Sequence, residues 1–216
     1  MKVLAVSDRI VDSLYSNEVA RQFPEVDLLI GCGDLPYFYL EFLVSSLNAT
    51  LVYVRGNHDG SPQYTSSGRT LFNPQGGINL HTTTYVVNGL LIAGLEGSMR
   101  YKPNASLMYT EAEMTMAVAR LIPRLLQRVV RYRRPLDILV THSPPFGIHD
   151  EKDLAHRGFK IFLTLLRMFR PRLLLHGHVH VYRSDTERIS KYENTTIVNV
   201  YPYRLLNIVD DDIEVI

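Results

Sequence analysis

Short runs rich in Val, Ile and Leu recur along this chain, and most of them end in a polar motif. Runs of this kind, bounded by Gly, Asp or Pro, are typical of strands buried on both faces of a sheet. The predicted strands of this type are Lys2–Val6, Val26–Ile30, Leu51–Val54, Leu136–Val140 and Arg172–Leu175. Because helical segments alternate with them, the pattern predicts mixed sheets flanked by helices, an α/β layered architecture.

Two further pairs of strands are indicated. Thr84–Val87 and Leu90–Ala93 are joined by Asn88-Gly89, a strong signal for a two-residue hairpin turn. Near the end of the chain, Thr195–Val200 and Tyr203–Val209 are predicted to form another β pair.

The predicted helices have recognisable ends. Pro36–Leu47 has Pro in its first turn and Asn48 just past its end, as helix punctuation predicts. Another helix is predicted from about His156 to Phe169. Its expected buried side consists of Phe159, Phe162, Leu163 and Leu166.

The longest predicted helix opens with a capping box formed by Thr110 and Glu113 and continues to about Tyr132. Pro123 is expected to kink or restart it, because proline lacks an N–H and clashes with the preceding turn. Its apolar stripe at helical spacing consists of Met114, Val118, Leu121, Ile122, Leu125, Leu126, Val129 and Val130. The arginines on its other face, interpreted as solvated surface, are Arg120, Arg124, Arg128 and Arg131.

Length and composition favour one domain over residues 1–216. With 216 residues and 46% hydrophobic content, the chain can bury a full core, and it contains no repeat, linker or low-complexity segment. A net charge of +1 argues against general polyanion binding, so nucleic acid is not an expected partner. The sequence gives no indication of oligomeric state.

The expected location is the cytoplasm. Cys32 is the only cysteine, so no disulfide forms within the chain, and a reducing compartment is the simplest interpretation. Asp8 comes too early for the apolar stretch of a signal peptide, and no run of about 18 apolar residues exists to span a membrane. No membrane partner is expected.

Candidate metal ligands follow the predicted strands. They occur in the motifs Asp8, Gly33-Asp34, Gly56-Asn57-His58-Asp59, His142 and Gly177-His178-Val179-His180. Divalent cations of intermediate hardness take imidazole and carboxylate ligands together. Ligands on different loops converge only if the loops share an edge of a sheet.

The spacing of His178 and His180 leaves two arrangements open. Residues two apart in an extended segment point to opposite faces, so either the chain turns between them or an ion lies on each side. The second arrangement fits a dinuclear centre, in which the metals lie about 3.5–4 Å apart.

Taken together, these motifs resemble those of the calcineurin-like metallophosphoesterases, over nearly the full length of the chain. The resemblance implies a four-layer α/β/β/α sandwich with two mixed β-sheets and two metal ions on the loops between them. It implies that Asp34 bridges both ions, that Asn57, His142 and His178 complete the second site, and that Asp8 and His180 hold the first. It also implies that His58 lies beside the scissile phosphate and that Asp59 orients its imidazole.

The chain departs from the family pattern at Ile10, where the family's Asp-x-His motif has histidine. The first site is therefore expected to be impaired, with only Asp8, Asp34 and His180 as protein ligands unless Asp12 or water fills the gap. Arg9 cannot be a ligand, but its charge could lie near a phosphate. The expected cofactors are one or two divalent ions (Mn, Fe, Zn or Ni).

The leading functional hypothesis is a metal-dependent hydrolase of phosphate esters, a phosphodiesterase or phosphatase, that uses a metal-bound hydroxide on a small phosphorylated substrate. Segments 98–109 and 144–157 are the expected pocket walls, and His156-Arg157 is a weaker candidate for phosphate contact. His81, His149, His156 and His176 are otherwise expected to be surface or hydrogen-bonded histidines. The alternatives are a single-ion enzyme, a catalytically weakened scaffold for protein interaction, and a nuclease that uses the basic helix.

Overall fold

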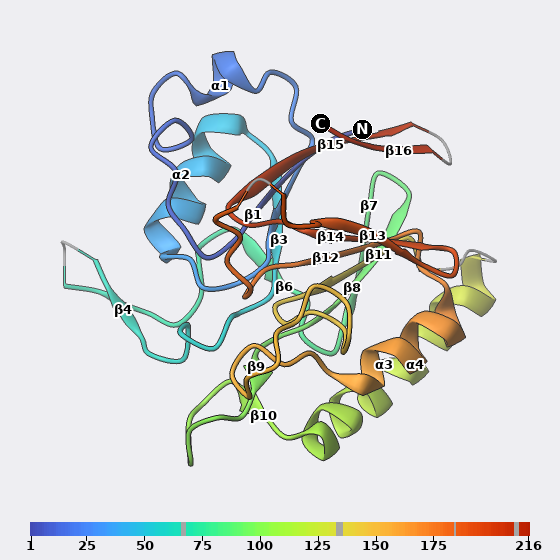
Figure 1. Cartoon of the computed structure of the whole chain (residues 1–216). Coiled ribbons are helices and arrows are strands. Elements are labelled where there is room, and N and C mark those ends of the chain that lie inside the picture. Colours follow the sequence, from blue (N-terminus) through green and yellow to red (C-terminus); the bar gives the residue numbers. More distant parts are fainter. Residues whose placement is uncertain (66–67, 133–135, 184, 210–211) are drawn as a thin grey trace.

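Two β-sheets packed face to face form the centre of the protein (Figure 1). The computed structural model describes residues 1–65, 68–132, 136–183, 185–209 and 212–216. Within these residues each large sheet has six strands, and helices cover the outer face of each sheet: α1 and α2 on one side, α3 and α4 on the other. The predicted four-layer α/β/β/α sandwich is thus confirmed.

The first sheet is parallel in its middle and antiparallel at one edge. Its order is β16-β15-β1-β2-β3-β6, with β1, β2, β3 and β6 parallel and with β15 antiparallel to both β1 and β16. The bounds are β1 Lys2–Val6, β2 Leu28–Gly31, β3 Thr50–Tyr53, β6 Gly77–Asn79, β15 Tyr203–Val209 and β16 Asp212–Val215.

The second sheet has the order β13-β14-β12-β11-β8-β7 and is parallel from β14 to β8. The bounds are β7 Thr84–Val87, β8 Leu90–Leu95, β11 Ile138–Thr141, β12 Leu173–His176, β13 Ile189–Tyr192 and β14 Thr195–Asn199. The hairpin predicted at Asn88-Gly89 joins β7 to β8. The small pairs are β4 Gln63–Tyr64 with β5 Thr70–Leu71, and β9 Ser98–Met99 with β10 Met108–Tyr109.

The core has three parts, which follow from the alternation of side chains along each strand. Val3 and Ala5 of β1 face the other sheet, where they join a cluster with residues of β8, β11 and β12, whereas Leu4 and Val6 face α1 and α2. A third cluster packs α3 and α4 on the second sheet. Burial on both faces explains why these strands are almost continuously apolar.

The helices have the bounds α1 Val19–Gln22, α2 Tyr37–Leu47, α3 Glu111–Tyr132 and α4 Lys160–Phe169. Helix α2 has the predicted ends, with Pro36 as its N-cap and Asn48 in the left-handed conformation after its last residue. None of the helices in the described part of the chain is long and apolar enough to cross a membrane.

The predicted pairing of the last two long strands is wrong. Strand β14 pairs with β12 and β13 in the second sheet, whereas β15 pairs with β1 and β16 in the first. The chain crosses from one sheet to the other between Asn199 and Tyr203. An apolar run indicates a strand, but its partner depends on which earlier strand offers an open edge.

Helix α3 continues through Pro123 instead of restarting there. Because proline has no N–H, the carbonyl of Ala119 lacks its usual hydrogen-bond donor in the helix. Ala119 and Pro123 both lie on the exposed face of α3, so water can donate to that carbonyl instead. The apolar stripe is also narrower than predicted, since Leu126 and Val130 are exposed. The side chain of Val129 lies outside the described residues.

Helix α4 begins at Lys160, four residues later than predicted. Phe159 is extended and bridges to Pro145, so the helix cannot include it. The first N–H groups of α4, at Lys160 and Ile161, instead donate to the Glu111 carboxylate at distances of 3.2 and 2.7 Å. His156 is therefore in a loop. The buried side is Phe162, Leu165, Leu166 and Phe169, which omits the predicted Leu163.

Candidate metal centre

The candidate ligands lie where parallel strands of both sheets end. Asp8 follows β1, Asp34 follows β2 and Asn57 follows β3, all in the first sheet. His142 directly follows β11, and His178 comes two residues after β12, both in the second sheet. Because the sheets pack face to face, loops from both can reach one site.

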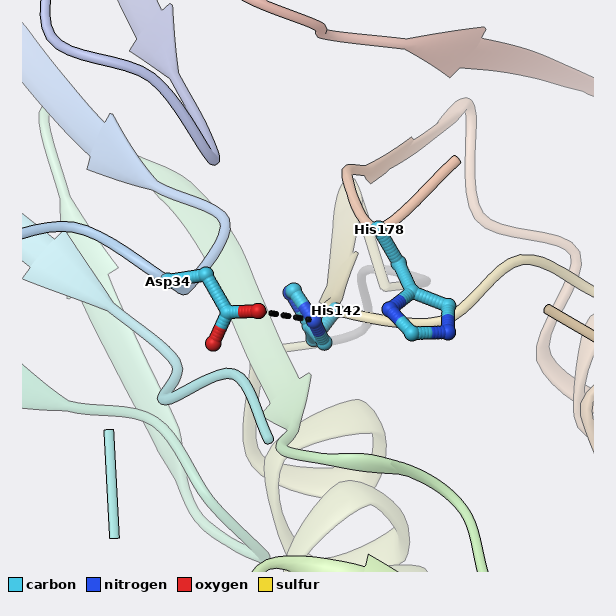
Figure 2. Close-up of side chains that lie close together, drawn as sticks. All are labelled: Asp34, His142 and His178. Atoms are coloured by element: carbon cyan, nitrogen blue, oxygen red, sulfur yellow. Dashed lines mark ion pairs between the residues drawn. The ribbon is translucent and has the colours of Figure 1, made fainter. Parts of the chain in front are cut away.

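Asp34, His142 and His178 come together in this way. One potential ligand atom from each lies within 4.8 Å of the others, and Asp34 Oδ2 is 3.3 Å from His142 Nε2. Figure 2 shows the three side chains, which come from three separate segments, with His142 between Asp34 and His178 in this view. His142 and His178 are buried, so the structure fixes their positions.

Backbone carbonyls select the ring nitrogens that are left for a metal. His142 Nδ1 lies 2.8 Å from the Cys32 carbonyl, and His178 Nε2 lies 2.7 Å from the Ala155 carbonyl. Because a carbonyl only accepts, these nitrogens carry hydrogens, which leaves His178 Nδ1 and, once it has lost its proton, His142 Nε2 as the nitrogens that would bind a metal. Asn57 Oδ1 is 3.1 Å from His142 Nε2, so this donor set fits a divalent cation.

Asp8 and His180 adjoin this group. Asp8 accepts the His178 backbone N–H at 2.9 Å, and its Oδ1 lies 3.6 Å from His180 Nε2. The His180 ring stacks on Tyr201 with centroids 4.6 Å apart, and its Nδ1 is 3.0 Å from the Tyr182 hydroxyl.

Five of the six predicted ligands line one open pocket of about 380 Å³: Asp8, Asp34, Asn57, His178 and His180. His142, fully buried, contacts Asp34 and Asn57.

The backbone at the ligands is unusual. Asp8, Asp34 and His178 have φ values of 62°, 56° and 68°, in the left-handed region that non-glycine residues rarely occupy. Such conformations persist where surrounding contacts over-determine them, and they cluster at functional sites. Glycine is required beside them, since a Cβ at Gly56 would overlap the Asp34 carboxylate and one at Gly177 would overlap Asp8.

The buried groups shift one another's pKa. Burial alone would raise the pKa of Asp34, but His142 outweighs it and lowers the pKa to about 2. Burial would lower the pKa of His142, but the Asp34 carboxylate raises it to about 9. For His178, burial and then the charge of His142 lower the pKa to about 4. Without a metal, the proton therefore resides on His142.

His58 and Asp59 differ from the arrangement that the resemblance implies. The His58 side chain is 70% exposed at the pocket, with Nε2 4.0 Å from Asp34 Oδ2. Asp59 Oδ2 accepts the backbone N–H groups of Asp34 and Gly56, both at 2.8 Å. Among the described residues no hydrogen bond joins the Asp59 carboxylate to the His58 ring. Burial, and then Asp34, raise the pKa of Asp59 to about 6.

Because position 10 is isoleucine, the first metal site has only the reduced set of protein ligands that the sequence predicts. Its side chain packs against the hydrophobic cluster beneath α1 and α2. Asp12 is exposed and does not line the pocket, so it offers no replacement. The protein groups available there are Asp8, Asp34 and His180, and the role of each ligand stays a prediction.

Sequence reasoning placed Tyr101 and Tyr109 in an expected pocket wall, but it missed the ion pair that supports the Gly56-Asn57 turn. Arg55 donates twice to Glu96, at 2.8 and 3.1 Å, and Glu96 is only 2% exposed. The Tyr109 hydroxyl also donates to Glu96, at 3.0 Å. Tyr101 lines the pocket and accepts a bond from Asn57 Nδ2 at 3.4 Å. Tyr101 thus lies in the expected wall 98–109, whereas nothing local indicated that Arg55 pairs with Glu96, because that contact depends on the tertiary fold.

Comparison with known protein families shows to which family the chain belongs. The model of the calcineurin-like phosphoesterases matches residues 1–182 of the chain. The chain belongs to this family. Members of this family bind divalent metals, and the carboxylate and imidazole groups gathered here are candidate ligands for such an ion.

Solved structures agree with the fold. The protein TT1561 of Thermus thermophilus is 17% identical with a TM-score of 0.62, covering 99% of this chain and 97% of that one. The phosphopantetheinyl hydrolase PptH from Mycobacterium tuberculosis is 14% identical with a TM-score of 0.55, covering 92% and 88%. At these identities the likeness extends to the fold alone. None of the curated proteins matches the chain.

Proposed function

We propose that this calcineurin-like phosphoesterase hydrolyses phosphate monoesters or diesters at the pocket formed by Asp8, Asp34, Asn57, His178 and His180. The observation that carries the proposal is the convergence of Asp34, His142 and His178 beneath that pocket, with Asn57 beside them. A divalent cation held there would polarise the phosphoryl group and make water a stronger nucleophile near neutral pH.

The chain's own residues would supply positioning and proton transfer. His142 and His178 are held by backbone carbonyls, so their ligand nitrogens are fixed before an ion arrives. His58 extends into solvent at the rim, where an imidazole nitrogen would give a proton to the leaving-group oxygen as the ester bond breaks.

We further propose that the ion bound first uses Asp34, Asn57, His142 and His178. The second position, with Asp8, Asp34 and His180, has one protein ligand fewer. Mutation of the residues that hydrogen-bond to metal ligands lowers metal affinity by ~10–100-fold, so the absence of a ligand itself should lower the affinity of the second position by at least that much. Elemental analysis of purified protein at increasing metal concentration would then give one ion per chain before two.

The direct test supplies the purified chain with Mn²⁺, Fe²⁺, Ni²⁺ or Zn²⁺ and a generic phosphate monoester and diester. Hydrolysis is expected with at least one ion and should fall at least 100-fold in His142→Ala. Thr115→Ala, on an exposed face of α3, is the matched control and should keep full activity. Metal binding without hydrolysis of either ester would favour the scaffold alternative instead.

His58 gives a sharper prediction. His58→Ala should slow hydrolysis of an alkyl phosphate, whose leaving group needs a proton, by about 10²–10⁴-fold. Hydrolysis of p-nitrophenyl phosphate, whose leaving group needs none, should change much less. Comparing kcat for the two substrates is the measurement, and equal effects on both would remove His58 from this role.

A further inference from the structure

The loop that joins β11 to α4, residues 142–159, is held in a defined conformation. At its base Phe146 and Phe159 donate backbone N–H groups to Phe159 and Pro144, at 3.1 and 3.2 Å. At its tip Glu151 donates to the His156 carbonyl at 3.2 Å. Gly158 allows the two sides to approach, because a Cβ there would overlap the Pro145 backbone. These contacts therefore hold the backbone of the tip in place.

The tip of this loop forms part of the pocket wall. Ala155 and His156 line the pocket, and the Ala155 carbonyl holds His178. The His156 ring lies beside the His178 ring, with centroids 5.3 Å apart. His156 is thus next to a predicted metal ligand while being absent from the group of Asp34, His142 and His178.

Asp153 determines how the His156 ring is presented. Its carboxylate accepts the backbone N–H groups of Ala155 and His156, at 2.9 and 3.1 Å, and lies 3.0 Å from His156 Nδ1. Because a carboxylate only accepts, Nδ1 carries a hydrogen. Nε2 is left as the second polar atom of the ring, and no described residue hydrogen-bonds to it. The side chain is 41% exposed, so a substrate in the pocket can reach it.

The pairing of Asp153 with His156 has the form that the resemblance implies for Asp59 and His58. Asp59 instead bonds the backbone of Asp34 and Gly56. An imidazole oriented by a carboxylate loses less freedom when it contacts a ligand than a solvent-exposed ring such as His58 does. His156 is therefore the better positioned of the two imidazoles for holding a substrate.

We propose that His156, with hydrogens on both ring nitrogens, donates Nε2–H to an oxygen of the phosphoryl group, and that Asp153, which accepts Nδ1–H, is the residue that positions it. The inference rests on the proposed function for its substrate class, a phosphate ester or the phosphate released from it. Because the contact is made in the bound state before reaction as well as during it, its loss should appear mainly in KM.

The test compares His156→Ala and Asp153→Asn with Leu154→Ala, an exposed neighbour in the same loop. In His156→Ala, KM and the inhibition constant of inorganic phosphate should both rise about 10-fold, with a smaller change in kcat. Asp153→Asn should raise both constants less, because an amide oxygen can still accept from Nδ1. Leu154→Ala should leave both unchanged, and elemental analysis should find the same metal content in all variants.

Two results would overturn the inference while leaving the proposed function in place. One is an active wild type whose KM and phosphate inhibition are unchanged in His156→Ala. The other is the loss of one metal ion from His156→Ala, which would make His156 a ligand together with Glu151 and Asp153, the three of which lie close together.

If the wild type hydrolyses neither ester, calorimetry with inorganic phosphate and the metal-loaded protein still tests whether His156 contacts phosphate. Phosphate binding that weakens about 10-fold in His156→Ala would support the contact without catalysis. Phosphate binding that is equal in both proteins, or undetectable in the wild type, would refute it.

Discussion

Asp34 and His142 form a buried pair in which each stabilises the charge of the other. The pKa of Asp34 is lowered to about 2 and that of His142 is raised to about 9, so the pair is ionised at neutral pH when no metal is present. A cation that takes the His142 Nε2 lone pair must displace the proton there. Affinity for metal is therefore linked to pH.

This linkage predicts that each ion bound between Asp34 and His142 releases about one proton at pH 7. His178, whose pKa is lowered to about 4, is already neutral and adds none. The apparent association constant for Mn²⁺ should therefore rise about 10-fold per pH unit between pH 6 and 8. Calorimetry in buffers of different ionisation enthalpy measures the proton count, and a pH-independent affinity would contradict the assignment.

At the level of single residues, the sequence indicated the ligands better than the groups that support them. The order and spacing of Gly33-Asp34 and Gly56-Asn57 placed the ligand candidates, since each follows a buried strand. The partner of a carboxylate is set by which donors the fold brings near it. Asp59 therefore accepts backbone N–H groups, and Asp153 pairs with His156. The spacing of these residues along the sequence could not indicate either contact.

At the level of elements, local signals predicted the start of α3 well. Thr110 and Glu113 cap it reciprocally: the Glu113 carboxylate accepts the Thr110 backbone N–H at 2.7 Å, and Thr110 Oγ1 accepts the Glu113 N–H at 3.3 Å. The start of α4 was predicted less well, because it depends on the bridge from Phe159 to Pro145 and on capping by Glu111. A helix start that a local capping box determines can be predicted from the sequence, whereas a start that depends on contacts with distant residues cannot.

The capping box gives a stability prediction. Thr110→Ala removes a hydroxyl that satisfies a free N–H of the first turn, so unfolding free energy should fall by about 1 kcal/mol. Thr115→Ala, the same substitution inside the helix, should cost little, because alanine is a better helix former. Urea denaturation of the two variants measures the difference, and equal midpoints would argue against the cap.

The end of β12 carries a chain of neutral histidines. Ser190 Oγ and His149 Nε2 lie 2.8 Å apart, His149 Nδ1 and His176 Nε2 lie 3.0 Å apart, and His176 Nδ1 is 2.9 Å from the Gly177 carbonyl. Burial, and then the neighbouring His149, lower the pKa of His176 to about 3. This chain helps to fix the backbone that leads into His178.

Acid should destabilise the protein through His176. Unfolded chains protonate histidine below pH about 6.5, whereas the folded state does not protonate His176 until about pH 3, so stability falls as pH decreases through this window. Between pH 7 and 5 the loss is about 2 kcal/mol. Urea denaturation of metal-free wild type and His176→Gln at both pH values should show a smaller loss in the variant, and equal losses would contradict the buried neutral state.

At the level of the whole molecule, the site depends on both sheets. Asp34 and Asn57 come from the first sheet, and His142 and His178 come from the second. The cluster that contains Val3, Ile92 and Leu173 holds the sheets together beneath them. The alternation of apolar strands with helices predicted mixed sheets flanked by helices, whereas the four-layer arrangement was implied by the family resemblance. The crossing of the last strands between sheets was not predicted, because the partner of a strand depends on the whole fold.

The central claim is that these widely separated side chains meet around a divalent cation. The most direct measurement is the anomalous scattering of a crystal soaked in Mn²⁺. The account predicts a peak among Asp34, Asn57, His142 and His178, with a weaker second peak beside Asp8 and His180 at higher concentration. A well-ordered crystal with no peak among these residues would contradict it.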